Sequence, residues 1–239
     1  MTPAHLLLLL TIWSVEERQA VPVSRQLVVV TTPAWDSVNG TLQRYSRSGA
    51  KSPWVAEGSA VPIVVGQTGL AWGDARAGAR RDPRKREGDG RAPAGRFPLG
   101  SVFGFGTSGS MPGLRMPYLP LSDGTECVDD IASVHYNRIV ERGDVRRVDW
   151  RSAERMRSID LYQLGVMVEY NTQPVRRGRG SCIFLHIWRA QGSPTSGCTA
   201  MPAADLETIA RWLDASRRPM LVQLPATEYA RLRGRWSLP

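Results

Sequence analysis

A histidine and a cysteine that lie twelve positions apart, His186 and Cys198, carry the clearest chemistry in this chain of 239 residues. A cysteine attacks a carbonyl carbon as its thiolate, so it needs a neighbouring base that lowers its pKa from about 8.5. Residues 191–197, QGSPTSG, are typical of a turn that could return the thiol to the histidine. The pair therefore predicts a cysteine nucleophile with His186 as its base. A buried structural cysteine and an unrelated histidine are the alternative.

The residue before the cysteine supports the same interpretation. Gly197 has no side chain, so the backbone at this point could approach a bound carbonyl group closely. The amides of Gly197 and Cys198 would then stabilise the oxyanion that forms when the thiolate attacks. The predicted catalytic residues are therefore Cys198, His186 and Gly197.

Two segments of the chain resemble the L,D-transpeptidases, the YkuD-like catalytic domain of bacterial cell-wall enzymes. The first runs from Phe184 to Met201 and contains FLHIWR and PTSGCTAM around the histidine and the cysteine. The second, KREGDGRAPAGRFPL at 85–99, follows the family pattern Lys-x-x-Gly-Asp-Gly-x-x-Pro-x-Gly-x-Phe. The resemblance implies a mainly β sandwich with one or two short helices. We place this catalytic domain at 26–225, followed by a C-terminal extension at 226–239.

One departure from the family pattern affects substrate binding. Many relatives carry an arginine two positions after the nucleophile, whereas this chain has Ala200 there. The short histidine-to-cysteine spacing is similar to a subgroup with an arginine three positions after the histidine, here Arg189. We expect Arg189 to contact a substrate carboxylate instead, because a planar guanidinium can form two parallel hydrogen bonds to it.

The resemblance implies a reaction on peptidoglycan stem peptides. Cys198 would attack the peptide bond before the terminal D-residue of a tetrapeptide donor, and the thioester would pass to an amine on another stem. His186 would accept the thiol proton and protonate the leaving amine, its ring oriented by a backbone carbonyl. No cofactor is required. Further substrate contacts are expected from Trp188, Thr195 and Ser196.

Two other functions stay open at this point. An L,D-carboxypeptidase or related peptidase would use the same nucleophile, with water in place of the acceptor amine. A basic wall-binding module with an inactive Cys/His pair is the other alternative, suggested by Ala200.

A polar segment in the middle of the chain, residues 126–138, could line the same site. Asp129 and Tyr136 are its candidates for binding a substrate amine, although a solvated loop with Asx turns explains these residues equally well. The three histidines and three cysteines form no close-spaced ligand set, so no metal site is predicted.

The three cysteines allow one disulfide and one free thiol in an exported protein. Since Cys198 is assigned as the nucleophile, elimination leaves Cys127 and Cys182 as the predicted pair. Such a disulfide would tie the segment around Cys127 to the strand that leads into His186.

The charge of the chain bears on its partners. The formal net charge is +9 and the pI is about 10.2. Such a protein is attracted to polyanions, and anionic cell-wall polymers are among the partners we consider. No DNA- or RNA-binding motif accompanies the charge, so nucleic acid is not a predicted partner.

The N-terminus predicts export. Residues 5–13, HLLLLLTIW, have the length of the apolar part of a signal peptide and are too short for a membrane span of about 20 residues. We therefore assign residues 1–20 as a signal peptide and expect a periplasmic or secreted protein with no membrane span after cleavage. A short buried helix is the alternative.

The remaining patterns predict the elements that position the site. Residues 26–32 and 41–46 are expected to form a hairpin around the turn signal Asn39-Gly40, followed by a strand at 60–65. Residues 73–96 are rich in Gly, Arg and Asp and predict a loop. Further expected elements are inner strands at 164–170 and 181–186, an amphipathic helix at 202–214 and a closing strand at 220–224.

Overall fold

The fold is taken from a computed structural model, which describes residues 23–74, 78–79 and 81–239. The predicted signal peptide at 1–20 lies outside these residues. Among the helices of the described residues, none has the length and apolar character needed to cross a bilayer.

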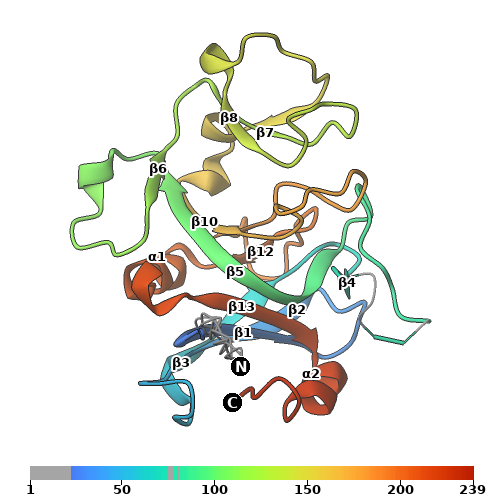
Figure 1. Cartoon of the computed structure of the whole chain (residues 1–239), viewed down its shortest axis with the longest axis vertical. Coiled ribbons are helices and arrows are strands. Elements are labelled where there is room, and N and C mark those ends of the chain that lie inside the picture. Colours follow the sequence, from blue (N-terminus) through green and yellow to red (C-terminus); the bar gives the residue numbers. More distant parts are fainter. Residues whose placement is uncertain (1–22, 75–77, 80) are drawn as a thin grey trace, which may run out of the picture.

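One large sheet forms most of the molecule (Figure 1). Its strand order is β10-β11-β12-β3-β2-β1-β13-β5-β4, β6 is added beside β5, and β10 also pairs with β5, so the sheet closes on itself. The predicted mainly β sandwich fold with one or two helices is confirmed. The strands are β1 (Gln26–Thr32), β2 (Asn39–Ser46), β3 (Val55–Val64), β4 (Leu70–Trp72), β5 (Ala92–Gly104), β6 (Tyr118–Pro120), β10 (Leu164–Val168), β11 (Phe184–Ile187), β12 (Thr199–Met201) and β13 (Met220–Pro225).

The first two strands form the predicted hairpin, with an antiparallel register from Gln26↔Ser46 to Thr31↔Thr41. The connection is residues 33–38, and Gly40 lies inside β2, so the turn predicted at Asn39-Gly40 is wrong. A Cβ at Gly40 would lie 2.5 Å from the carbonyl oxygen of Thr31. The glycine is therefore needed because two strands approach closely, and not because the chain turns there.

The loop predicted at 73–96 ends earlier than expected, because β5 begins at Ala92. Pro93 and Gly95 lower the strand propensity of this segment, yet it pairs with β4 on one side and with β13 on the other. Tertiary pairing decides the conformation here, which local sequence could not reveal.

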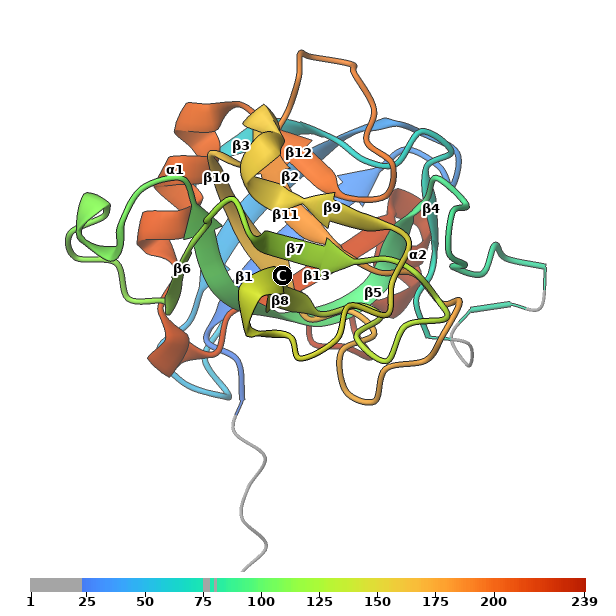
Figure 2. The same ribbon diagram turned by 90° about the horizontal axis from the view of Figure 1, so that it is seen from above.

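A second, small sheet lies over one end of the large one, above β10 and β11 (Figures 1 and 2). Its strand order is β8-β7-β9, with β7 at Thr125–Val128, β8 at Ile139–Glu141 and β9 at Ala153–Arg155. Short 3-10 helices connect the elements: η1 (Ser108–Ser110), η2 (Arg142–Asp144), η3 (Met156–Ser158), η4 (Asp160–Tyr162) and η5 (Ala215–Arg217).

The two α-helices pack against the large sheet. The predicted helix is present as α1 (Ala203–Trp212), and it buries the expected apolar face of Leu206, Ile209 and Ala210. The second helix, α2 (Ala226–Leu232), belongs to the segment beyond residue 225 and contacts β13 and β1. Its Leu232 is buried in the main core, so this C-terminal segment is part of the packed domain.

The arrangement of three strands positions the candidate nucleophile and base. The predicted neighbours β10 and β11 are antiparallel, and β11 pairs in parallel with β12. His186 on β11 is the register partner of Ala200 on β12. Cys198 directly precedes β12, so the loop between the two strands brings the thiol to Phe184 at the start of β11.

Candidate active site

His186 and Cys198 line one cavity of about 490 Å³. Both residues are buried, with 5% and 7% of their surfaces exposed. The loop 188–198 also contributes Trp188, Arg189, Thr195 and Ser196 to the lining. The structure therefore brings together six of the residues that the sequence predicts for catalysis and substrate binding.

The histidine is oriented by the backbone of its neighbour. Nδ1 of His186 lies 2.8 Å from the carbonyl oxygen of Ile187. Because a carbonyl only accepts hydrogen bonds, this contact places the ring proton on Nδ1 and leaves Nε2 as the basic atom. Burial lowers the pKa of His186 to about 4. At neutral pH the imidazole is therefore uncharged and able to take up a proton.

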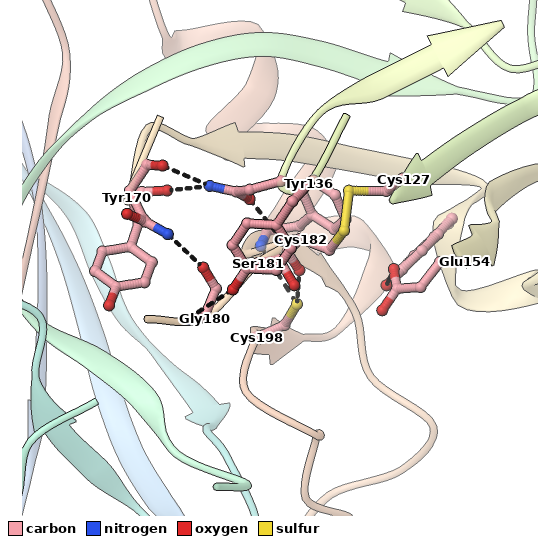
Figure 3. The surroundings of a disulfide bond; sticks show 12 residues. Cys127, Tyr136, Glu154, Tyr170, Gly180, Ser181, Cys182 and Cys198 are labelled. Carbon is pink, nitrogen blue, oxygen red and sulfur yellow. Dashed lines mark hydrogen bonds between the residues drawn. A yellow bond between two sulfur atoms is a disulfide. The ribbon is translucent and has the colours of Figure 1, made fainter. Parts of the chain in front are cut away.

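The thiol of Cys198 is held by two backbone groups. It donates to the carbonyl oxygen of Cys182 at 3.3 Å and accepts from the amide of Phe184, also at 3.3 Å (Figure 3). Burial is the main reason why the pKa of Cys198 lies well above its usual range, and the negative charge of Glu154 adds to the effect. At neutral pH the thiol of Cys198 and the imidazole of His186 are therefore both uncharged.

Thr195 organises the turn that carries the nucleophile. Its hydroxyl donates to the carbonyl oxygen of Cys198 at 2.7 Å and accepts from the amide of Gly197 at 3.1 Å. The Gly197 amide is therefore occupied in this structure, and the oxyanion role expected for it, which stays a prediction, would require this hydrogen bond to break. The amide of Cys198 remains a candidate donor. A Cβ at Gly197 would lie 3.1 Å from the carbonyl oxygen of Arg91, so the glycine permits close packing at this point.

The second segment of the family pattern, residues 85–99, packs against this turn. Asp89 accepts from Lys85 Nζ at 2.7 Å and from the amides of Arg86 and Arg91, at 2.7 and 2.9 Å. These contacts fix the loop before β5, whose residue Arg91 packs against Gly197. Lys85 also moderates the raised pKa of Cys198 by its positive charge.

A disulfide joins Cys127 on β7 to Cys182, the residue whose carbonyl accepts the hydrogen bond from the Cys198 thiol (Figure 3). Cys198 is the free cysteine. The disulfide therefore ties the small sheet to the segment before β11.

Of the two candidates in the polar segment, Asp129 lines a cavity and Tyr136 is almost fully buried. The cavity that Asp129 lines is a second one, of about 270 Å³, which also reaches Cys198. Tyr136 has an exposed fraction of 2%, donates from its hydroxyl to Glu87 and accepts from the amide of Gly180 at 3.1 Å. Its hydroxyl therefore links Glu87 to Gly180, and its role in substrate binding stays a prediction. In the part of the chain that the structure describes, no group of three or more His, Cys, Asp or Glu could hold a metal ion.

Two residues of the site were missed by the sequence analysis. The hydroxyl of Tyr162 donates to Glu154 Oε2 at 2.7 Å, and the tyrosine ring meets the ring of His186 edge-on at 5.3 Å between centroids. Both residues line the cavity of the nucleophile. Burial raises the pKa of Glu154 to about 7, and the negative charges of Asp129 and Glu87 act in the same direction. No motif marks this segment, so only tertiary structure could reveal it.

Comparison with known protein families agrees with the fold and the site. The L,D-transpeptidase catalytic domain, YkuD, matches residues 51–222, which is more than half of the chain. The chain therefore belongs to the YkuD family of L,D-transpeptidase catalytic domains. Searches of curated proteins and of solved structures found no match.

Proposed function

We propose that this protein is an exported cysteine acyltransferase, an L,D-transpeptidase that acts on the tetrapeptide stems of peptidoglycan. The observation that carries the proposal is that Cys198, at the end of the loop before β12, and His186, on β11, line one cavity of a YkuD-family domain. Export to the periplasm or the cell exterior is part of the proposal, since the substrate lies outside the cytoplasm and the domain has a disulfide.

The first half-reaction forms a thioester. His186 Nε2 takes the proton of the Cys198 thiol as the sulfur attacks the carbonyl carbon before the terminal D-residue of the donor. The amide of Cys198 stabilises the oxyanion, and the imidazolium then protonates the leaving amine. Because both groups are neutral at rest, no isolated charge is buried before the substrate arrives.

Substrate recognition relies on the mouth of the same cavity. Arg189 is exposed beside Trp188, where its guanidinium can bind the terminal carboxylate of the donor. Ser196 lines the cavity next to the nucleophile and offers a hydroxyl to the peptide backbone. Thr195 acts indirectly, by fixing the turn.

A direct test incubates the purified mature protein, and a Cys198→Ala variant, with tetrapeptide muropeptides and separates the products by liquid chromatography with mass spectrometry. We expect cross-linked dimers and free D-amino acid only when Cys198 is intact. Shortened stems without dimers would instead identify a carboxypeptidase. Unchanged substrate with folded protein would contradict the proposal and favour the wall-binding alternative.

A further inference from the structure

The candidate nucleophile lies between two cavities of different charge. The larger cavity contains His186 and Arg189, as described above. The smaller one is lined by the carboxylates Glu87, Asp129 and Glu154 and by Lys85. Three residues line both cavities, namely Glu154, Ser196 and Cys198. A group bound in the smaller cavity would therefore approach a thioester on Cys198 from a different direction than the donor does.

The smaller cavity has an excess of negative charge. Its cation, Lys85, already pairs with Asp89 at 2.7 Å, outside the set of three carboxylates. Among the described residues, no ion pair involves Glu87, Asp129 or Glu154. Glu87 accepts hydrogen bonds from the hydroxyls of Tyr136 and Ser181, which do not neutralise its charge. Uncompensated carboxylates in a partly buried cavity favour a cationic ligand.

One carboxylate oxygen in this cavity has an unmet hydrogen-bond requirement. Asp129 Oδ1 is buried and, within the described part of the chain, has no hydrogen-bond partner. A buried acceptor without a partner costs roughly 1 to 3 kcal/mol, so rotation of the Asp129 carboxyl group toward a donor bound in the cavity would recover this free energy. An ammonium group has three donors and carries the matching charge.

Glu154 connects this carboxylate set to the reacting atoms. It shares both cavities with Cys198, and it is joined through the hydroxyl of Tyr162 to the ring that packs against His186. In Figure 3 its carboxyl group points toward the region of the Cys198 thiol. Of the three carboxylates, Glu154 is therefore the one that also lines the larger cavity, where the donor is proposed to bind.

We propose that Glu154 is a further catalytic residue, which binds the ammonium of the acceptor stem together with Asp129 and removes one proton from it. The inference rests on the proposed function and names the group that the smaller cavity takes, a cationic primary amine.

The second half-reaction then balances. The acceptor ammonium gives one proton to the Glu154 carboxylate, and the free amine attacks the carbonyl carbon of the thioester. The new C–N bond forms, and His186 takes the second proton from the nitrogen. As the C–S bond breaks, His186 passes this proton to the departing sulfur, and Glu154 releases its own proton to solvent. The products are an amide, the Cys198 thiol and one proton.

The acidity of the group suits this task. A pKa near 7 leaves a useful fraction of Glu154 ionised at neutral pH while it remains a competent base. The charged and titratable groups that face Glu154 are Tyr162, Asp129, Glu87, Cys198 and Lys85. Binding of an ammonium would lower the pKa of Glu154, because an opposite charge stabilises the carboxylate.

The test separates acylation from transfer with two acceptors. Tetrapeptide muropeptides serve as donor and as cationic acceptor, and hydroxylamine serves as an acceptor that is uncharged at neutral pH. For Glu154→Gln we expect acylation of Cys198, measured by intact-protein mass spectrometry, to fall much less than transfer to the stem amine, because a glutamine side chain can still accept the hydrogen bond from Tyr162. Dimer formation should fall about ten-fold or more, whereas transfer to hydroxylamine should persist, because only the cationic acceptor must lose a proton first.

Further variants guard against a purely structural effect. Glu154→Asp should restore part of the transfer to the stem amine. Asp129→Asn should raise the KM for the acceptor with a smaller change in kcat, and it keeps the proposal testable if Glu154→Gln does not fold. Glu207→Gln removes an exposed carboxylate that pairs with Arg211 on α1, so it should leave both half-reactions unchanged.

The contrary results are distinct. If Glu154→Gln slows acylation and both transfers equally, the residue supports the fold and the inference is overturned. A parent enzyme that is acylated but only hydrolyses its thioester also overturns it, while leaving Cys198 as the nucleophile. A parent enzyme that is never acylated contradicts the proposed function itself.

Discussion

The thiol of Cys198 donates its hydrogen bond to the carbonyl oxygen of Cys182, a residue that is itself bonded to Cys127 on the small sheet. The nucleophile is thus positioned by a backbone group that is fixed from two sides. On one side β11 follows within two residues, and on the other the disulfide ties Cys182 to β7. The small sheet therefore supports the site although its strands lie outside the main sheet.

Removal of the disulfide should weaken both stability and activity. For the double variant Cys127→Ala, Cys182→Ala we expect a loss of roughly 2 to 4 kcal/mol in the free energy of unfolding, because the unfolded chain gains freedom. Dimer formation should fall as well, since Cys182 and Glu154 would be held less firmly. Urea unfolding and muropeptide turnover check the two effects. Full activity with only a loss of stability would show that the small sheet does not position the site.

The thiol should react slowly with alkylating agents at neutral pH. Burial raises the pKa of Cys198, so the thiolate fraction at pH 7 is small. We expect the iodoacetamide rate to be at least about ten-fold below that of an unstructured cysteine peptide and to increase steadily as the pH rises. Mass spectrometry of quenched samples measures it. A rate that is already at its plateau below pH 7 would instead indicate a thiolate-imidazolium pair at rest.

The pH dependence of the free energy of unfolding should show the contribution of a neutral, buried His186. Its pKa falls from an ordinary 6.5 to about 4 in the folded protein because of burial. Between these values the unfolded chain binds more protons, so this residue makes the protein less stable as pH falls from 6.5 to 4, by at most about 3 kcal/mol. Urea unfolding from pH 4.5 to 7.5 should show this contribution as a difference from His186→Gln. Parallel curves for the two proteins would contradict the neutral, buried imidazole.

Glu154 should change the free energy of unfolding with pH in the opposite direction, over a similar pH range. Its pKa rises from 4.5 to about 7, so the folded protein binds the extra proton and loses stability as pH rises through this window. The two contributions partly cancel in the parent protein. In the same urea experiment, Glu154→Gln should therefore become more stable with rising pH than the parent does, and His186→Gln less so. If the two variants deviate from the parent in the same direction, one of the two assignments is wrong.

Arg189 should matter for donor binding more than for the chemical step. For Arg189→Lys we expect the KM for the tetrapeptide donor to rise about ten-fold, because a lysine cannot form the paired hydrogen bonds of a guanidinium to a carboxylate. Initial rates over a range of donor concentrations measure it. Arg235→Lys, an exposed arginine outside the lining of the cavity, is the matched control. An unchanged KM for Arg189→Lys would remove the residue from the donor site.

Loss of the Thr195 hydroxyl alone should lower the kcat of the protein. Thr195→Val keeps the shape of the side chain but removes both hydrogen bonds of the turn, so we expect kcat to fall about ten-fold or more as the nucleophile loses its fixed position. Thr195→Ser keeps the hydroxyl and should retain most of the activity. Equal losses in both variants would argue against the hydrogen bonds as the cause.

The sequence was most informative where local pattern and tertiary role agree. The strand β1 was predicted from its continuous β-branched run, and the helix α1 from the helical spacing of apolar residues around Leu206, because both patterns are local. The region around Cys198 was recognised because its motif carries the chemistry. Gly40 and the start of β5 were misinterpreted, since a close approach and a pairing partner decide those segments, and neither is local.

Only part of the candidate site could be predicted from the sequence, for a similar reason. His186 and Cys198 lie in one short stretch, whereas Glu154 and Tyr162 reach the site from β9 and η4 of the region between β5 and β10. A carboxylate gains its raised pKa from burial and from neighbours distant in sequence, and no spacing rule encodes those. The hydrogen bond from the amide of Gly197 to Thr195, two residues away, was likewise not predicted from the sequence.

The parallel pairing of β11 with β12 also makes the positions of the histidine and the cysteine independent of the length of the loop between them. The parallel register pairs His186 with Ala200. The chain between Trp188 and Gly197 is a loop that leaves the sheet and returns to it. Loops of different length can connect the same two strand ends with little difference in free energy. Insertions and deletions there would reshape the mouth of the substrate cavity while the catalytic pair stays in place. We therefore expect a change in the length of this loop to alter which ligands the cavity accepts without moving His186 or Cys198.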